Sequence, residues 1–369
     1  MVKTIAVIGA GNGGKAAAGD LALKGYSVRL FDFPEFQQNL KSIKLTHKIS
    51  LTGAIEGIGE LEMVTTDLSK AINGADLIMI CTQALAHDRL AREMAPLVKP
   101  HQSIVINGGS SGGSLLFAHI FRQIGLKELP LLVETSTLTY ACRGKDNRVH
   151  IFLKVGRIVY CSLPSTSLDQ IAPTLEKIYP GLVRGRSVLE ASLNNGNPVI
   201  HPAIAILNTA RIEQEGSKMH FYKDGVSKAV ARLIAAVDSE RMALLKALGY
   251  PAQSDPVTSV MQGYAESPDY FECYSNGSGY IEIPAPESLD HRYLHEDVGI
   301  GLVFFCSLGE LLGVPMPNSK ALVRIASTLT GIDYFQLARR TVESVGIAGL
   351  TLSQLKEYMR TGQYPALPG

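Results

Sequence analysis

The stretch that decides the fold is "TIAVIGAGNGGKAAAGD", Thr4 to Asp20. It opens with an apolar run of strand length and continues with an alanine-rich segment that favours a helix. Between the two lie Gly9, Gly11 and Gly14 in GxGxxG spacing. In this setting the glycines allow a tight turn, a close approach of the backbone to a pyrophosphate and close packing of the helix on the strand. The stretch therefore predicts a dinucleotide-binding βαβ unit.

An aspartate ends the next strand-like run, "SVRLFD", residues 27–32. Asp32 follows the glycine motif by about 20 residues, the spacing at which an acidic side chain binds the ribose 2′-hydroxyl of NAD. Because a carboxylate repels a 2′-phosphate, Asp32 favours NAD over NADP. Arg29 lies within the strand, so it counts less as a partner for the 2′-phosphate of NADP. An unrelated aspartate after a glycine turn is the alternative. The expected cofactor contacts, which include the amides at the helix start, are Gly9, Gly11, Asn12, Gly13, Gly14 and Asp32.

Strand-like runs and helical stretches alternate through the rest of the first half. The runs "ADLIMIC", "QSIVIN" and "LPLLVET" are apolar and have the length of strands. Such alternation predicts βαβ units around a parallel sheet. The segment "NRVHIFLKVGRIVYCSL", residues 147–163, instead predicts an antiparallel hairpin that turns near Gly156.

Two loops follow strands of the predicted sheet: "QALAH", residues 83–87, and "NGGSSGG", residues 107–113. Ligands bind at the carboxyl ends of parallel strands, so the second loop should face the nicotinamide end of the cofactor. Gln83 and His87 are candidates for lining the cofactor cleft. A flexible turn before a helix, and a solvated histidine in a first helical turn, are the alternatives.

Long helical patterns replace the strands in the second half. Residues 225–249, 298–313 and 319–331 are expected to be helical, and Gly249 and Gly313 stand where helix C-caps belong. The turn-rich segment at residues 267–288 predicts a loop. The fold class is therefore α/β, with an N-terminal Rossmann domain built on a mainly parallel sheet (residues 1–186) and an all-α C-terminal domain (residues 187–369).

The composition limits the function classes. Apolar residues make up 46% of the 369-residue chain and charged residues 19%, so the chain can bury a large core. A formal net charge of +1 gives no electrostatic signal for nucleic acid or an anionic membrane. The five cysteines show no CxxC pair and no apolar run is long enough to span a bilayer, so a cytoplasmic protein is expected.

One histidine stands between two prolines in "LNNGNPVIHPAIAIL", residues 193–207. Either a long helix runs through this segment and kinks at Pro198, or Asn197 caps a new helix with Pro198 in its first turn. In a continuous helix Asn194 and Asn197 would share a face with His201, which suggests a wet cleft. Histidine is the usual general acid or base near neutral pH. A half-buried structural histidine beside a helix cap is the alternative.

A second polar cluster, "LDHRYLHEDVGIGLVFF", precedes an apolar helix at residues 289–305. Arg292 could clamp a carboxylate through two parallel hydrogen bonds. Asp297 could orient a histidine and stabilise its charged form, although helix capping alone would also explain this aspartate. The histidines lack metal-ligand spacing, and no metal is expected.

Several of these motifs together resemble the opine dehydrogenases, the NAD/NADP octopine/nopaline dehydrogenase family. The similarity is to the bacterial enzymes that act on N-(1-carboxyethyl) amino acids, and it extends to about residue 315. The motifs are "GAGNGG", "LALKG", "NGGSSGG", "ETSTLTYACR", "SLNNGNPVIHP" and "HRYLHEDVGIGL". The chain departs from the family pattern at Pro198 within the asparagine cluster and in the loop at residues 271–287.

The resemblance implies NAD(P)H-dependent reductive condensation of an α-keto acid, often pyruvate, with the amine of an amino acid. Such an enzyme is an oxidoreductase acting on CH–NH bonds, with its active site between the two domains. The implied catalytic pair is His201 and Asp297. The implied substrate-binding residues are Arg292 and Thr137, and the polar stripe beside His201 adds Asn194 and Asn197 as candidates. A homodimer is the expected assembly.

Two other functions are compatible with the motifs. A reductase similar to ketopantoate reductase would reduce a 2-keto acid without an amine, but such enzymes use a lysine where this chain offers His201. A non-catalytic NAD-binding regulator would keep the glycine motif and Asp32 without needing His201, Arg292 and Asp297 together.

Overall fold

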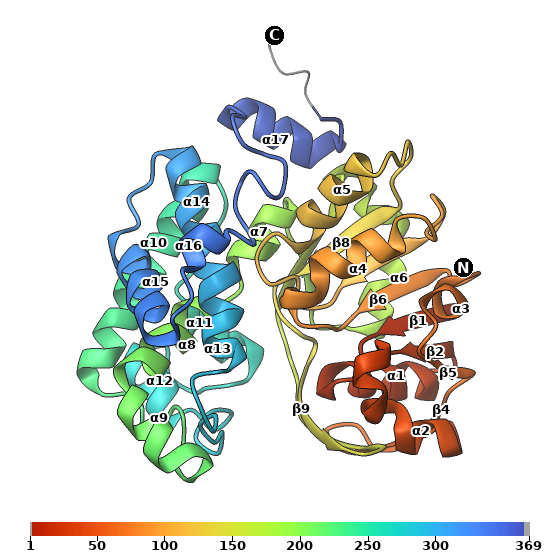
Figure 1. Cartoon of the computed structure of the whole chain (residues 1–369), viewed down its shortest axis with the longest axis horizontal. Helices are drawn as coiled ribbons and strands as arrows, with labels where there is room; N and C mark the ends of the chain where they lie inside the picture. Colours follow the sequence, from red (N-terminus) through yellow and green to blue (C-terminus); the bar gives the residue numbers. More distant parts are fainter. Residues whose placement is uncertain (1, 365–369) are drawn as a thin grey trace. The chain divides into compact units, whose positions relative to one another are not determined.

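The computed structural model describes residues 2–364, and these form two compact units (Figure 1). The first unit contains the chain up to Gly109, residues 113–188 and the described residues from Glu357 onward. The second contains residues 189–356 together with the short segment Ser110–Gly112. The predicted ranges, 1–186 and 187–369, divide the chain only once. The structure instead returns the end of the chain to the first unit, because Arg122 donates hydrogen bonds to the Tyr358 hydroxyl and the Gly362 carbonyl there.

The first unit is built on an eight-stranded sheet in the order β12-β11-β8-β7-β6-β1-β2-β5. All neighbouring strands run parallel except β8 and β11, which are antiparallel. The predicted Rossmann architecture with a mainly parallel sheet is thus confirmed. Its strands are β1 (Thr4–Ile8), β2 (Ser27–Phe31), β5 (Met63–Thr65), β6 (Leu77–Ile80), β7 (Ser103–Ile106), β8 (Leu131–Thr135), β11 (Ile158–Leu163) and β12 (Leu182–Arg184).

A second sheet in the same unit has four strands in the order β4-β3-β10-β9. Its strands are β3 (Lys48–Gly53), β4 (Gly57–Glu60), β9 (Tyr140–Lys145) and β10 (Arg148–Lys154). Helix α1 (Asn12–Leu23) contacts strands of both sheets, including β2 and β9, so it is buried along most of its length.

The predicted hairpin around Gly156 is wrong. Strand β10 pairs with β9, turning at Asp146 and Asn147, whereas β11 belongs to the large sheet and pairs with β8. Asp146 adopts a left-handed conformation with φ of 55°, which suits the tight turn. The turn signal was therefore the Asp-Asn pair and not the glycine between the two apolar runs.

The remaining helices of the first unit connect its strands. Helices α4 and α5 pack against each other, and α5 also packs on β8. The α-helices of this unit besides α1 are α2 (Lys41–Thr46), α3 (Leu68–Ile72), α4 (His87–Met94), α5 (Gly113–Gln123), α6 (Ala172–Ile178) and the first residue of α7 (Val188–Leu193).

The second unit is helical, as predicted, and α10 and α14 end at Gly249 and Gly313 in the left-handed conformation of helix C-caps. The expected loop at residues 267–288 contains a short helix, α12, whose N-cap Asp269 accepts two backbone hydrogen bonds. The helices are α7 after its first residue, α8 (Asn197–Leu207), α9 (Thr209–Glu215), α10 (Lys228–Leu248), α11 (Asp255–Gln262), α12 (Tyr270–Asn276), α13 (Arg292–His295), α14 (Val303–Leu312), α15 (Pro317–Thr330), α16 (Tyr334–Leu337) and the start of α17 (Leu352–Thr361), whose residues from Glu357 onward belong to the first unit. Within residues 2–364 we find no helix with both the length and the apolar character needed to cross a bilayer.

Candidate functional site

The turn between β1 and α1 has the geometry that a pyrophosphate requires. Gly9 adopts φ of +100°, which a residue with a side chain rarely tolerates. A Cβ atom on Gly14 would lie 1.7 Å from the Gly9 carbonyl oxygen, so the helix can approach the strand this closely only with glycine there. Gly11 is the N-cap of α1, with open space where its side chain would be. This turn therefore leaves room beside free backbone amides for a dinucleotide.

Asp32 lies against the same turn, at the end of β2. Its Oδ2 accepts hydrogen bonds from the Ala10 amide at 3.2 Å and the Asn39 side chain at 2.9 Å, and its Oδ1 accepts one from the Phe33 amide. Burial raises the pKa of this carboxyl group, and these hydrogen bonds oppose the shift. The predicted juxtaposition of Asp32 and the glycine turn is present.

Two other predicted residues of this unit, Gln83 and Thr137, lie beyond the carboxyl ends of strands of the large sheet. Gln83 is exposed, three residues after β6, and Thr137 follows β8 with its carbonyl accepting a hydrogen bond from the Thr135 hydroxyl. Asn12 has a structural contact, because its Oδ1 accepts the Gly144 amide proton at 3.0 Å. His87 is fully buried and packs edge-on to Phe117, so it is neither solvated nor free to line a cleft.

In the second unit, His201 and Asp297 are in contact although they are far apart in sequence. His201 Nδ1 lies 2.6 Å from Asp297 Oδ2, and both residues are more than nine-tenths buried. Burial lowers the pKa of His201, and the Asp297 carboxylate partly offsets this shift. A neutral imidazole would thus donate its Nδ1 proton to Asp297 and keep a lone pair on Nε2. This is the arrangement of a histidine held as an acid or base.

A close contact between two segments brings this pair together. A Cβ atom on Gly301 would lie 2.3 Å from Pro198 Cγ, so the missing side chain lets the first turn of α8 approach the segment that carries Asp297. That segment, Asp297–Leu302, is a single π-helical turn between α13 and α14. Such turns occur frequently at functional sites, where they redirect a side chain. Asp297 is the first residue of this turn and not an N-cap, since the residue at the cap position is Glu296.

The helix that carries His201 starts anew after a break. Of the two predicted geometries the structure has the second, displaced by one residue: Gly196 is the N-cap of α8 and Pro198 lies within its first turn. The Asn197 amide donates to the Asn195 side chain. Asn194 lies outside α8 and its side chain donates to the Glu190 carbonyl oxygen of α7. The stripe of Asn194, Asn197 and His201 expected for a continuous helix therefore does not extend to Asn194, whereas Asn197 and His201 both lie in α8.

Arg292, the predicted carboxylate clamp, lies beside the pair. Its Nη1 forms an ion pair with Glu296 Oε2 at 3.0 Å, one helical turn further on, and Glu296 Oε1 lies 3.3 Å from the Ser110 hydroxyl. Glu296 is buried while about a third of the Arg292 side chain is exposed. Arg292 is thus anchored at Nη1 to Glu296, and a planar guanidinium held at one nitrogen keeps further N–H donors for an anionic group.

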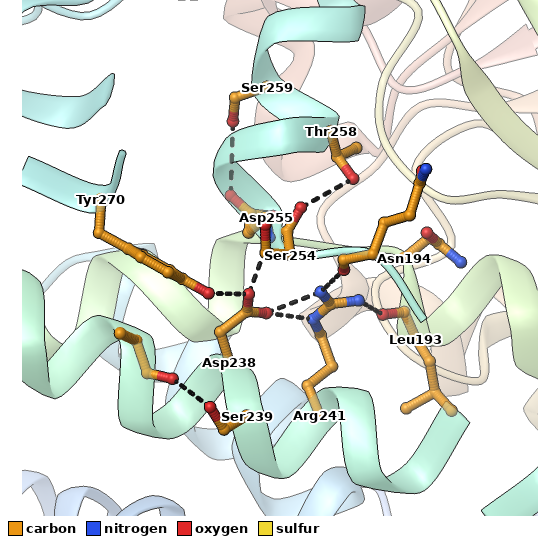
Figure 2. A network of polar contacts seen from close by, with 12 residues as sticks. Leu193, Asn194, Asp238, Ser239, Arg241, Ser254, Asp255, Thr258, Ser259 and Tyr270 are labelled. Atoms are coloured by element: carbon orange, nitrogen blue, oxygen red, sulfur yellow. Dashed lines mark hydrogen bonds and ion pairs between the residues drawn. The ribbon is translucent and has the colours of Figure 1, made fainter. Parts of the chain in front are cut away.

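The start of α8 is held by a buried polar network, which Figure 2 shows from close by. Arg241 of α10 forms an ion pair with Asp238 at 2.7 Å and donates to the carbonyl oxygens of Leu193 and Gln253. Asp238 also accepts the Tyr270 hydroxyl and the Asp255 amide. Burial, and then the nearby Asp238, raise the pKa of Asp255 to about 6. A Cβ atom on Gly196 would lie 1.9 Å from Asp255 Oδ1, so this carboxyl group packs directly on the N-cap of α8.

Two protein-family models match this chain, one in each unit. The model of the octopine/nopaline dehydrogenase α-helical domain matches residues 184–330, and that of the NAD-dependent glycerol-3-phosphate dehydrogenase N-terminus matches residues 4–125. The opine dehydrogenase of Arthrobacter sp. (strain 1C) is 33% identical to the chain over 359 residues, covering 96% of this chain and 98% of that protein. The chain belongs to the opine dehydrogenase family.

Solved structures of similar proteins share the fold of this chain. Octopine dehydrogenase in complex with NADH and agmatine superposes with a TM-score of 0.80 at 20% identity, and coverage is 100% of both chains. Yersinopine dehydrogenase with NADP+ bound superposes with a TM-score of 0.75 at 16% identity and 98% coverage of both chains. Membership of the family makes the chain an NAD(P)-dependent oxidoreductase that acts on CH–NH bonds.

Two features of the candidate site were not predicted from the sequence. Tyr222 places its hydroxyl 2.8 Å from His201 Nε2, and nothing in the surrounding "MHFYKDG" marks it out. The buried Thr82 hydroxyl, just after β6, has no hydrogen-bond partner within residues 2–364, and its methyl group lies next to Gly9. The second could have been suspected from the rule that ligand contacts follow parallel strands.

Proposed function

We propose that this enzyme condenses an α-keto acid, pyruvate in the first instance, with the amino group of an amino acid and reduces the resulting imine with NADH. The observation that carries the proposal is the buried contact between His201 and Asp297, with Arg292 in α13, just before the turn that carries Asp297. This trio supplies a proton-transfer group, a charged side chain that supports it, and a cation that can bind a substrate carboxylate. Relatives named opine dehydrogenase and octopine dehydrogenase support the substrate class.

Each residue of the trio has a distinct proposed role. Arg292 pairs with the keto-acid carboxylate through the donors that Glu296 leaves free, and so fixes the carbonyl carbon in place. His201 exchanges the proton that must leave the amine and later protonate the departing hydroxyl. Asp297 holds the Nδ1 proton of the imidazole and stabilises the imidazolium while it exists. The bound nicotinamide supplies the hydride that reduces the imine carbon.

We also propose the cofactor contacts and the remaining substrate contacts. The glycine turn and Asp32 form a cradle that fits a dinucleotide, and the carboxylate beside it favours NAD over NADP. The further cofactor contacts proposed are Asn12, Gly13 and Gln83, and the substrate contacts proposed are Thr137 and Asn197. Asn194 is not retained as a substrate ligand, because its side-chain amide donates to the Glu190 carbonyl oxygen of α7. A homodimer and a cytoplasmic location remain predictions from the sequence.

A substrate screen tests the proposal. NADH oxidation would be followed with pyruvate alone, with single amino acids alone, and with each pair. We expect oxidation only when both substrates are present, with a secondary amine as the product. Turnover with a keto acid alone would favour the simple reductase instead. Tight NADH binding without turnover across a broad panel of keto acids and amines would favour the non-catalytic regulator.

The variant His201→Ala tests the proton-transfer role within the same assay. We expect turnover to fall by about two to four orders of magnitude, the usual contribution of a general acid or base. NADH affinity should change little, because the glycine turn and Asp32 lie in the other unit. Fluorescence titration with NADH provides the control. Turnover near the wild-type level would remove His201 from the mechanism.

A further inference from the structure

Both ring nitrogens of His201 are occupied by protein side chains. Nδ1 contacts Asp297 Oδ2 at 2.6 Å and Nε2 contacts the Tyr222 hydroxyl oxygen at 2.8 Å. An imidazole has only these two sites for proton exchange. In this structure a substrate therefore cannot reach an exchangeable site of His201 directly. Either Tyr222 moves aside during turnover, or the proton passes through its hydroxyl.

The packing around Tyr222 opposes a movement of its ring. Tyr222 is 4% exposed and lies edge-on to Phe221, with ring centroids 5.1 Å apart, and against Tyr280 at 4.6 Å. Its carbonyl oxygen accepts the Val226 amide proton. His201 is held as well, because the Tyr293 ring lies over it at 4.1 Å. Swinging a phenol out of such a cluster would open a cavity, whereas rotating its O–H bond displaces no heavy atom.

A phenol hydroxyl is suited to pass a proton on, because it donates one hydrogen bond while its oxygen accepts another. With Asp297 taking the Nδ1 proton of a neutral imidazole, the Tyr222 hydroxyl must be the donor to Nε2. The lone pairs of the Tyr222 oxygen are then available to a second partner. Burial and the neighbouring tyrosines raise the pKa of Tyr222 well above its usual value, so the hydroxyl stays neutral in the resting enzyme.

We propose that Tyr222 is a catalytic residue that relays protons between His201 and the reacting substrate. The inference rests on the proposed reductive condensation and adds a residue that touches the substrate. When the carbinolamine forms, the substrate ammonium gives a proton to the Tyr222 oxygen as Tyr222 gives its own proton to His201 Nε2. The nitrogen lone pair that this transfer frees forms the new C–N bond while the carbonyl π bond opens onto its oxygen. One further proton moves from the nitrogen to that oxygen, which gives the neutral carbinolamine.

The same two transfers run in reverse when water leaves. Imidazolium Nε2 returns its proton to the Tyr222 oxygen, and the Tyr222 hydroxyl proton goes to the carbinolamine hydroxyl. The C–O bond breaks, water departs and the nitrogen lone pair closes the iminium bond. Over both steps Tyr222 and His201 end in their starting protonation states, so the relay needs no further reactant. Asp297 stabilises the imidazolium that exists between the two steps.

The variant Tyr222→Phe tests the relay, because it removes one oxygen and keeps the aromatic packing. We expect kcat with pyruvate and the best amino acid to fall about a hundredfold, while the KM values stay within a few fold. Tyr280→Phe is the matched control, since it removes a buried hydroxyl from the adjoining ring, where the partner is Ser259. We expect kcat of this control to stay within about threefold of wild type.

Solvent isotope measurements separate a relay from a merely structural hydroxyl. In mixtures of H2O and D2O, two coupled transfers give a curved dependence of kcat on the deuterium fraction, and we expect a linear one for Tyr222→Phe. An unchanged or higher kcat for Tyr222→Phe would overturn the relay and indicate a residue that only covers His201. If that variant does not fold, 3,5-difluorotyrosine at position 222 replaces it. If kcat with this more acidic phenol equals that of the wild type, the proposal is overturned.

The failure of the relay can be distinguished from the failure of the proposed function. If wild-type enzyme oxidises NADH with no pair of keto acid and amine, the proposed reaction fails, whatever Tyr222 does. The ¹⁵N resonances of His201 then still test the contact without turnover. We expect the Nε2 resonance to move in Tyr222→Phe and to stay in Tyr280→Phe. An unmoved Nε2 resonance in the first variant would rule out the hydrogen bond on which the relay depends.

Discussion

At the residue scale, the environment of His201 sets which protonation state it holds. Burial lowers the pKa of His201 most, Asp297 raises it, and the nearby Arg292 lowers it further. The adjacent His291 is affected in the same sense, with its pKa lowered to about 4, first by burial and then by Arg292. The imidazole is therefore neutral at neutral pH, and Asp297 keeps its cationic form accessible when a proton arrives.

Asp297→Asn tests this balance. Loss of the negative charge should lower kcat about a hundredfold or more, because the imidazolium loses its support and the amide can favour the wrong tautomer. In the oxidative direction, which needs neutral His201, activity is lost as pH falls through the pKa of His201. Burial already places that pKa below its usual value, and the variant lacks the carboxylate that raises it, so the acidic limb should move to lower pH. A pH profile of kcat/KM checks the direction, and a shift to higher pH would contradict it.

Arg292→Lys tests the carboxylate clamp while keeping a positive charge beside the buried Glu296. An ammonium group lacks the planar fork of a guanidinium, so the KM for the keto acid should rise about tenfold, with a smaller effect on kcat. Initial rates at varied keto-acid concentration measure the change. Arg324→Lys is the control, since Arg324 is an exposed residue of α15. Equal KM values for both variants would exclude the clamp.

At the scale of elements, the break between α7 and α8 explains why the chain tolerates Pro198 and Pro202 around His201. Pro198 lies in the first turn of α8, where a missing amide proton costs little, and its ring fills the space that Gly301 leaves open. Pro202 lies deeper in the helix and leaves the Pro198 carbonyl without its helical donor. The gain is a close approach of α8 to the π-helical turn, which places His201 against Asp297.

Arg241→Met tests whether the polar network of Figure 2 holds this break in place. Removing one member of a buried ion pair leaves Asp238 without its cation, which typically destabilises a protein by about 3–5 kcal/mol. We expect a loss of that order in urea unfolding, together with a lower kcat, because the Leu193 carbonyl loses its donor. Arg232→Met, at an exposed position of the same helix, is the matched control. Equal stability of the two variants would show that the network contributes little.

At the scale of the whole molecule, the residues proposed for nucleotide recognition and those proposed for proton transfer lie in different compact units. The glycine turn and Asp32 belong to the first unit, whereas His201, Tyr222, Arg292 and Asp297 belong to the second. Each unit matches a different family model, one for a dehydrogenase N-terminus and one for the octopine dehydrogenase helical domain. Variants in the first unit should therefore alter cofactor binding, and variants in the second unit should alter proton transfer.

Asp32→Asn tests this separation. The loss of charge should weaken NADH binding about tenfold or more, since hydrogen bonds to a charged group contribute about 1.5–3 kcal/mol, and should improve the relative binding of NADPH. The pH dependence set by His201 should not change. Binding titrations with both nucleotides and the pH profile of the variant measure the two effects. Asp88→Asn, at an exposed residue of α4, is the control. An unaltered preference for NADH would remove Asp32 from cofactor selection.

The sequence predicted more of the glycine turn in the first unit than of the His201 site in the second unit. Spacing rules placed Gly9, Gly14 and Asp32 correctly because a strand, a turn and a helix that follow one another fix their own geometry. They failed for the hairpin at Gly156, because local patterns do not say with which strand an edge will pair. They also missed Tyr222, since a tyrosine in a helical domain is more often an ordinary core residue than a catalytic one.

The order of the residues by itself determined the alternation of strands and helices, the glycine turn, and the presence of a histidine, an arginine and an aspartate suited to acid–base chemistry. Local backbone preferences and hydrophobic periodicity act over a few residues, so they can be recognised in one dimension. Only the tertiary structure decided that α8 begins anew at Asn197, that the missing side chain of Gly301 admits Pro198, and that Tyr222 occupies Nε2 of His201. These contacts join residues up to about a hundred positions apart, and close packing of whole elements, which no local pattern encodes, brings them together.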